Sequence, residues 1–223
     1  MNFFVGGIDT DCGKTAVTAL ISKYLLSIGY TVITQKPVQT GCEKVADDIK
    51  FHRKTEGRNF LEEDYNGLTC RYLFKYPASP HLSAMMENVK IDPQLIFNDS
   101  QALQSKYQVV LTEGAGGLYV PLYGDYYTID YIKNYNLNLV LVTSSKLGSI
   151  NHALLSIEAC KARAINLHSV IYNYLPNWDK VISPESEKRI EQFAHKMYPN
   201  SKFYAVPTVD NFENKIVEFK DFI

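Results

Sequence analysis

One segment near the N-terminus restricts the fold more than any other, and it reads Gly7-Ile8-Asp9-Thr10-Asp11-Cys12-Gly13-Lys14-Thr15. It follows a short apolar run at residues 3–5 and precedes residues 14–27, where apolar side chains recur at helical spacing. In proteins with this order of strand, loop ending in Gly-Lys-Thr and helix, the backbone N–H groups of the loop and of the helix N-terminus bind a polyphosphate. The order therefore predicts a phosphate-binding loop (P-loop), although five residues rather than the usual four separate Gly7 from Gly13.

Two residues of this loop have specific expected roles. The Lys14 ammonium should reach the β- and γ-phosphates of a nucleotide, and the Thr15 hydroxyl should ligate Mg²⁺. A glycine-rich turn followed by a chance Lys-Thr pair is the alternative. The strand before the loop and the helix after it argue against that alternative.

The rest of the chain alternates between strand-like and helix-like segments. Apolar runs, several of them β-branched, predict further buried strands at 32–34, 109–112, 139–143, 169–172 and 203–206. Helical periodicity returns at 149–163 and 184–197. This alternation predicts an α/β fold of the P-loop NTPase type, with three layers and a mostly parallel central sheet. We expect one domain over residues 1–223, with short helices and loops at 41–92, the least periodic part.

Composition excludes several classes of protein. The 23 basic and 24 acidic residues nearly balance, so the basic excess typical of a nucleic-acid-binding protein is absent. No apolar run approaches the roughly 20 residues of a membrane span, and the N-terminal apolar run is too short for a signal peptide. The 4 cysteines show no metal-ligand spacing. We therefore expect a cytoplasmic protein with free thiols and with neither nucleic-acid nor membrane partners.

Polar residues stand where two further strands end, and ligands of open parallel sheets bind beyond those ends. Lys36 follows the second strand, and Pro37 biases it towards extended geometry. Glu113 follows the strand at 109–112, where a carboxylate beside a P-loop is expected to act with magnesium. The glycines of Gly114-Ala115-Gly116-Gly117 let the backbone approach a ligand closely. A solvated lysine and a structural glycine turn are the plainer interpretations.

Two other segments have more than one interpretation. The pair Asp47-Asp48 offers further carboxylates, but taken alone it is more typical of a charge pair at a helix start. Lys146 precedes the helix predicted from residue 149, which makes a second anion site there. A helix cap with an incidental lysine fits the local pattern equally well. Together with the P-loop, a second anion site indicates ATP and a small acidic co-substrate.

Taken in order, several segments resemble the dethiobiotin synthetases over nearly the whole chain. They are residues 7–15, Lys36-Pro37-Val38 through Gly41, Ser79-Pro80-His81, residues 113–117 and residues 146–153. The resemblance implies an ATP- and Mg²⁺-dependent ligase that converts 7,8-diaminononanoate and CO₂ to dethiobiotin, ADP and phosphate. The reaction would pass through a carbamate and a carbamic-phosphoric anhydride, in the penultimate step of biotin biosynthesis.

The same resemblance implies roles for individual residues. The catalytic residues would be Lys36, Lys14 and Thr10. Magnesium would be held by Thr15, Asp47 and Glu113, with Asp48 as the alternative within the doublet. The ATP-binding residues would be Asp11, Cys12, Gly13, Lys14, Thr15, Ala16, Asp47, Glu113, Gly114, Ala115, Gly116, Asn173, Val206, Pro207 and Thr208. The substrate-binding residues would be Thr40, Leu147, Gly148 and Asn151.

The resemblance also implies a homodimer, in which the segment from Gly148 to Asn151 of one subunit receives the tail carboxylate of substrate bound mainly to the other. One departure is Tyr174, which stands after Asn173 where an acidic residue is common.

Two rival functions use related folds. A partition or positioning ATPase usually carries an extra lysine early in the P-loop, whereas this chain has Ile8-Asp9-Thr10 there. An amidoligase related to cobyrinic acid synthesis would bring a glutaminase domain, for which 223 residues leave no room.

Overall fold

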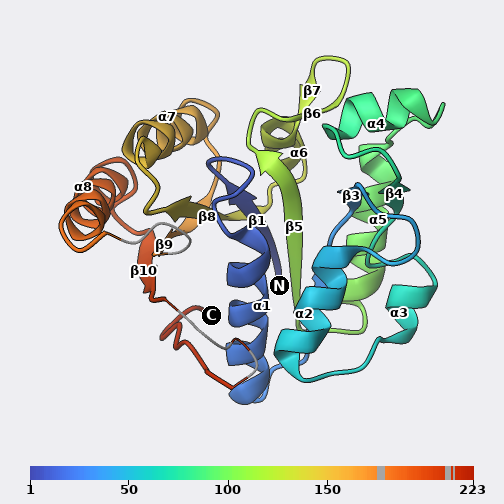
Figure 1. Ribbon diagram of the computed structural model, residues 1–223, viewed down its shortest axis with the longest axis horizontal. Coiled ribbons are helices and arrows are strands. Elements are labelled where there is room, and N and C mark those ends of the chain that lie inside the picture. The colour runs from blue at the N-terminus through green and yellow to red at the C-terminus, as the bar shows by residue number, and fades with distance from the viewer. Residues whose placement is uncertain (175–178, 209–211, 213) are drawn as a thin grey trace.

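A six-stranded sheet organises the computed structural model, which describes residues 1–174, 179–208, 212 and 214–223 (Figure 1). Its strands lie in the order β10-β9-β8-β1-β5-β2, and every neighbouring pair is parallel. They are β1 (Asn2–Gly7), β2 (Val32–Gln35), β5 (Val109–Gly117), β8 (Asn138–Ser144), β9 (Leu167–Asn173) and β10 (Lys202–Val206). Each of the six predicted strands lies within one of them, and the predicted fold class is confirmed.

Helices cover both faces of this sheet because successive side chains of a strand point to opposite faces. On one face, Phe3 and Val5 pack in a cluster with Leu20 of α1 (Lys14–Ser27). On the other face, Phe4 packs in a cluster with Ile129 and Ala153. These two residues belong to α6 (Thr128–Asn134) and α7 (Ser149–Ala162). The result is the three-layer arrangement expected from the sequence.

The helix predicted at 184–197 begins earlier than expected, as α8 (Ile182–Met197). The carboxylate of Asp179 accepts hydrogen bonds from the backbone N–H groups of Val181 and Ile182. These hydrogen bonds hold the backbone just before α8, ahead of Pro184, where the helix was expected to begin.

Residues 41–92 contain short helices, as predicted, and one strand of a small sheet that was not predicted. The helices are α2 (Asp47–Glu56), α3 (Glu62–Tyr65) and α4 (Pro80–Met86). The small sheet pairs β3 (Val38–Thr40) with β4 (Tyr72–Phe74) in parallel. Strands of three residues are too short for a periodic pattern. The remaining elements are α5 (Pro93–Gln104), β6 (Pro121–Tyr123) and β7 (Tyr126–Tyr127).

The carboxyl ends of the parallel strands meet at one edge of the sheet. In Figure 1 this is the upper edge, where the arrowhead of β5 lies near β6, β7 and α6. The P-loop after β1, Lys36 after β2 and the glycine run of β5 therefore come to the same edge. Within the described part of the chain, no helix has the length and apolar character needed to cross a membrane.

Candidate active site

The P-loop folds around the side chain of Lys14. The Lys14 Nζ donates to the carbonyl oxygens of Asp9, at 2.7 Å, and Thr10, at 3.0 Å. Cys12 lies buried beneath the loop, and its Sγ donates to the same Asp9 carbonyl. A Cβ atom at Gly7 would lie 2.5 Å from this sulfur, so only glycine fits there. Helix α1 begins at once at Lys14, so its free N–H groups face the loop.

A lysine and two carboxylates meet beside the loop. The ammonium of Lys36 lies 2.6 Å from Oδ2 of Asp48 and 2.9 Å from Oε1 of Glu113. It also donates to the carbonyl oxygen of Gly114 at 3.1 Å. Lys36, which follows β2, and Glu113, which lies within β5, are both buried, and their contact balances the two charges inside the protein.

Both oxygens of the Glu113 carboxylate have contacts. Oε1 accepts a hydrogen bond from the Thr15 hydroxyl at 2.9 Å, in addition to its contact with Lys36. Nε2 of His52, a buried side chain of α2, lies 2.9 Å from Oε2. No sequence motif indicated His52, because it lies in the least periodic part of the chain.

The charges of this cluster shift one another's pKa values. Burial would lower the pKa of Lys36, but Glu113 and Asp48 outweigh it and raise that pKa above its ordinary value. Burial would raise the pKa of Glu113, but Lys36 and His52 hold it well below its usual range. The pKa of Asp48 is raised, by burial and then by the neighbouring Glu113, despite Lys36. The carboxylates of Asp48 and Glu113 thus share the single ammonium of Lys36. The negative charge left over favours the binding of a further cation beside them.

The structure places the two aspartates of the doublet differently. The Asp47 side chain is 63% exposed and pairs with Lys50 at the surface, whereas Asp48 is 20% exposed and faces Lys36. Both residues lie in the first turn of α2, and successive helical side chains point about 100° apart. Only one of them can face the site, and it is Asp48.

A cavity of about 240 Å³ joins the P-loop to this cluster. It gathers most of the residues predicted for catalysis and phosphate binding. Its lining consists of Thr10, Asp11, Lys14, Thr15, Lys36, Val38, Gln39, Thr40, Asp48, Glu113, Ala115 and Gly116. Val38 and Gln39 were not among the predicted site residues, and Asp48 was named only as the alternative to Asp47. Cys12, Gly13 and Ala16 lie beside it in the loop and the first turn of α1.

The residues predicted to hold the adenine lie farther along the edge of the sheet. Asn173 is buried at the end of β9, and its Nδ2 donates to the Cys12 carbonyl at 3.1 Å. A second cavity, of about 550 Å³, is lined by Tyr174, Pro184, Ala205, Pro207 and Thr208. Val206 is buried. Its carbonyl accepts a hydrogen bond from the backbone N–H of Tyr174.

Three predicted substrate-binding residues lie apart from Lys36. Leu147, Gly148 and Asn151 line a groove of about 680 Å³ with Val181 and Ile182, at the starts of α7 and α8. Within one subunit the structure does not bring them into the cavity of Lys36 and Thr40.

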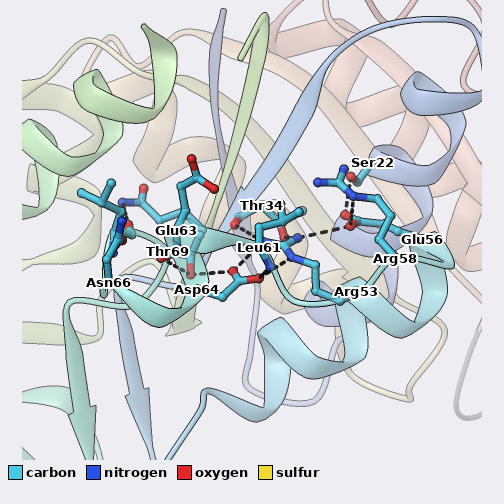
Figure 2. A network of polar contacts seen from close by, with 12 residues as sticks. Ser22, Thr34, Arg53, Glu56, Arg58, Leu61, Glu63, Asp64, Asn66 and Thr69 are labelled. Atoms are coloured by element: carbon cyan, nitrogen blue, oxygen red, sulfur yellow. Dashed lines mark hydrogen bonds and ion pairs between the residues drawn. The ribbon is translucent and has the colours of Figure 1, made fainter. Parts of the chain in front are cut away.

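A buried polar network behind the cavity holds α2 in place (Figure 2). The guanidinium of Arg53 donates twice to the Asp64 carboxylate, at 2.9 and 2.8 Å, and once to the Thr34 hydroxyl, at 2.8 Å. It also lies 3.2 Å from Glu56, which accepts a hydrogen bond from Ser22 of α1. The network therefore ties α2 to β2, α3 and α1.

The same network reaches the backbone of Lys36. The Thr69 hydroxyl donates to Asp64 at 2.8 Å, and the Thr69 carbonyl accepts from the backbone N–H of Lys36 at 2.7 Å. One buried carboxylate thus supports both the helix that carries Asp48 and the strand end that carries Lys36.

The donor atoms of the cavity suit magnesium bound together with a nucleotide. No cluster of three or more His, Cys, Asp or Glu that could hold a metal occurs in the described residues. Thr15, Asp48 and Glu113 instead offer one hydroxyl and two carboxylates around the Lys36 ammonium. Mg²⁺ prefers such oxygen ligands and is commonly bound by one or two carboxylates plus substrate phosphates.

A parallel sheet with a P-loop after its first strand defines a P-loop α/β protein of the nucleotide-binding class. A family model described as an AAA domain matches residues 1–209. A ParA family ATPase from Chlorobium tepidum TLS is similar in structure, with a TM-score of 0.56 and 14% identity over 94% of this chain and 85% of that one. The MinC:MinD cell division complex of Aquifex aeolicus gives a TM-score of 0.53, with 16% identity over 94% and 82% of the respective chains. At these identities the likeness concerns the fold alone.

Sequence relatives are more specific. The chain is 48% identical to "ATP-dependent dethiobiotin synthetase BioD 2" of Haemophilus ducreyi, over 90% of this chain and 95% of the relative. It is 51% identical to the protein of the same name from Haemophilus influenzae, over 80% and 94%. A dethiobiotin synthetase of Chlorobaculum tepidum is 46% identical, over 83% and 78%. The chain belongs to the ATP-dependent dethiobiotin synthetases.

Proposed function

We propose that this protein is a ligase that uses ATP to close the urea ring of dethiobiotin from 7,8-diaminononanoate and CO₂. The observation that carries this proposal is the position of Lys36. Its ammonium lies in the same cavity as the P-loop residues Lys14 and Thr15, so one cation can meet both a γ-phosphate and a small anionic substrate.

The reaction divides into three steps. The nitrogen of one amine attacks CO₂ and loses a proton, which gives a carbamate. A carbamate oxygen then attacks the γ-phosphorus, and ADP leaves. The second amine attacks the carbonyl carbon of the mixed anhydride, loses its proton and expels phosphate, which closes the ring.

The lysines stabilise the charge that develops in these steps. Lys36 is buried, so its charge acts strongly on a carbamate and on the phosphoryl group in transfer. Lys14 extends along the inside of the loop and neutralises the γ-phosphate. Thr10 lines the same cavity and adds a hydroxyl near the transferred group.

Thr15, Asp48 and Glu113 would hold Mg²⁺. When bound, the ion neutralises phosphate charge and so favours phosphoryl transfer. Asp48 takes the place first expected for Asp47, because it faces Lys36 and Asp47 does not.

The nucleotide lies along the carboxyl edge of the sheet in this proposal. The backbone of Asp11, Cys12 and Gly13 and the start of α1 at Ala16 hold the phosphates, with Gly114, Ala115 and Gly116 opposite. The 550 Å³ cavity beside Pro207 and Thr208 receives the adenine, with Asn173 linking it to the P-loop.

The tail of the diamine requires a second subunit in this proposal. Thr40 lies in the cavity of Lys36, whereas Leu147, Gly148 and Asn151 lie in a separate groove. Leu147 and Val181 are 82% and 80% exposed, which supports a protein partner over this groove. We infer a cytoplasmic homodimer in which this groove serves the substrate of the other subunit.

ATP turnover tests the proposal. We expect ADP release to be slow with the protein alone, and slow with either the diamine or bicarbonate alone, but to rise sharply with both. Turnover that responds to a protein, DNA or membrane instead, or that needs glutamine, would contradict it.

A further inference from the structure

His52 occupies a position that none of the roles above explains. The His52 side chain is fully buried. It lies on the same face of α2 as Asp48, which precedes it by four residues, about one helical turn. Its Nε2 lies 2.9 Å from Oε2 of Glu113. The helix therefore directs two side chains at the cluster, one at Lys36 and one at Glu113.

His52 contacts the Glu113 oxygen, Oε2, that neither Thr15 nor Lys36 contacts. Oε1 of Glu113 accepts from the Thr15 hydroxyl and from Lys36. A carboxylate held through one oxygen can turn about its last carbon–carbon bond. The imidazole Nε2, 2.9 Å from Oε2 but outside hydrogen-bond geometry, restricts this rotation, so that Oε1 stays directed at Thr15.

The imidazole is itself held firmly because its neighbour in sequence anchors α2. Arg53 forms the buried pair with Asp64 and donates to Thr34 of β2, as Figure 2 shows. His52 cannot move away from Glu113 without disturbing these contacts. The position of its ring is thus set by the fold rather than by a ligand.

We propose that His52 is a positioning residue that fixes the Glu113 carboxylate for the Mg²⁺ bound with the nucleotide. This inference rests on the proposed function only in taking Glu113 as a metal ligand. His52 contacts the oxygen opposite the one that faces Thr15, so it orients the ligand and does not bind the metal. Loss of such an outer partner typically lowers metal affinity or activity by about 10- to 100-fold.

Two substitutions separate positioning from simple packing. His52→Leu fills most of the ring's volume but has no polar atom. His52→Gln carries an Nε2 donor at a similar distance from the backbone. The control is His195→Gln, which changes an exposed histidine of α8. If His52 only fills space, the Leu variant should match the wild type more closely than the Gln variant.

Calorimetric titration of Mg²⁺ into each protein with ADP present is the direct test. We expect His52→Leu to bind Mg²⁺ about 10- to 100-fold more weakly, with the ADP affinity in EDTA unchanged. His52→Gln should recover most of the loss, and His195→Gln should behave as wild type. In turnover assays the Mg²⁺ requirement should rise in the Leu variant while KM for the diamine stays constant.

Unchanged Mg²⁺ affinity in a folded Leu variant would overturn the proposal, as would a Gln variant as weak as the Leu variant. If the Leu variant fails to fold, His52→Met provides a second apolar replacement for the same titration. The titration needs no diamine, so it is independent of the ring-closing assignment. A wild type that closes no ring but shows this Mg²⁺ pattern would remove the proposed function and leave His52 as a positioning residue.

Discussion

The carboxylate of Asp48 lies 2.6 Å from the ammonium of Lys36, at the junction between a P-loop cavity and the first turn of α2. Glu113 approaches the same ammonium from β5 at 2.9 Å. Two carboxylates from different elements therefore converge on a single positive charge. This arrangement gives the site both a cation for anionic substrates and oxygen ligands for a metal.

Removal of Lys36 should abolish turnover. We expect Lys36→Ala to lower kcat by at least about 100-fold, which corresponds to roughly 3 kcal/mol of lost charge stabilisation. Dethiobiotin formation and ADP binding would be measured together, and ADP binding should remain. Lys50→Ala is the control, because Lys50 pairs with Asp47 at the surface. Near-normal turnover of Lys36→Ala would remove this lysine from the mechanism.

The aspartate doublet should behave asymmetrically. Asp48→Asn should lower activity at a fixed Mg²⁺ concentration on the order of 100-fold, because it removes a carboxylate that faces the cavity. Asp47→Asn should remain close to wild type, since its side chain faces solvent. The check is a Mg²⁺ titration of activity for both variants. The reverse result would show that α2 rotates when nucleotide binds.

Gly13 should be irreplaceable for nucleotide binding. Its φ is +92°, and a Cβ atom there would lie 2.1 Å from Nδ2 of Asn173. Gly29 has nearly the same φ, +95°, but open space around it. Gly29→Ala should therefore cost only the strain of a left-handed residue, about 1–2 kcal/mol. Gly13→Ala should cost more stability and also lose ADP binding, measured by calorimetry. Equal effects of the two substitutions would contradict the packing described here.

The buried Asp64 should make stability depend on acid pH. Burial would raise the pKa of Asp64, but hydrogen bonds from Arg53 and the charge of Arg53 outweigh it and lower that pKa below 3.8. The folded pKa is thus lower than the unfolded one, so the stabilisation is fully present above about pH 4 and is lost as pH falls through the folded value.

Urea unfolding of wild type and Asp64→Asn between pH 7 and pH 2.5 measures this effect. We expect the variant to be less stable at pH 7 by about 3–5 kcal/mol, since Arg53 loses a buried partner. The difference should shrink below pH 4. Asp125→Asn, an exposed aspartate between β6 and β7, should show no such convergence. A constant difference across the pH range would argue against an ionised Asp64 in the folded protein.

Local sequence signals predicted the main sheet and the P-loop well. The strand at β1, the loop around Lys14 and the helix α1 are contiguous, so periodicity and motif spacing describe them completely. The position of Lys36 after β2 was also evident, because parallel strands share one carboxyl edge. The expected end of the next strand at residue 112 was wrong, since β5 continues through Glu113 to Gly117.

What the sequence could not show depends on contacts between distant residues. The choice between Asp47 and Asp48 depends on how α2 is rotated, which the contact between Arg53 and Asp64 sets. The contact of His52 with Glu113 joins α2 to β5 and has no local motif. The groove at Leu147 would gain its role only from a second subunit, which no pattern within one chain describes.

The most direct test of the proposed reaction follows the carbon of CO₂. The purified protein would be given ¹³C-bicarbonate, 7,8-diaminononanoate, Mg²⁺ and ATP, and the product examined by mass spectrometry and ¹³C NMR. A cavity that joins Lys14 of the P-loop to Lys36 predicts label in the ureido carbonyl, with about one ADP formed per ring. ADP formation without a labelled ring would contradict ring closure at this site.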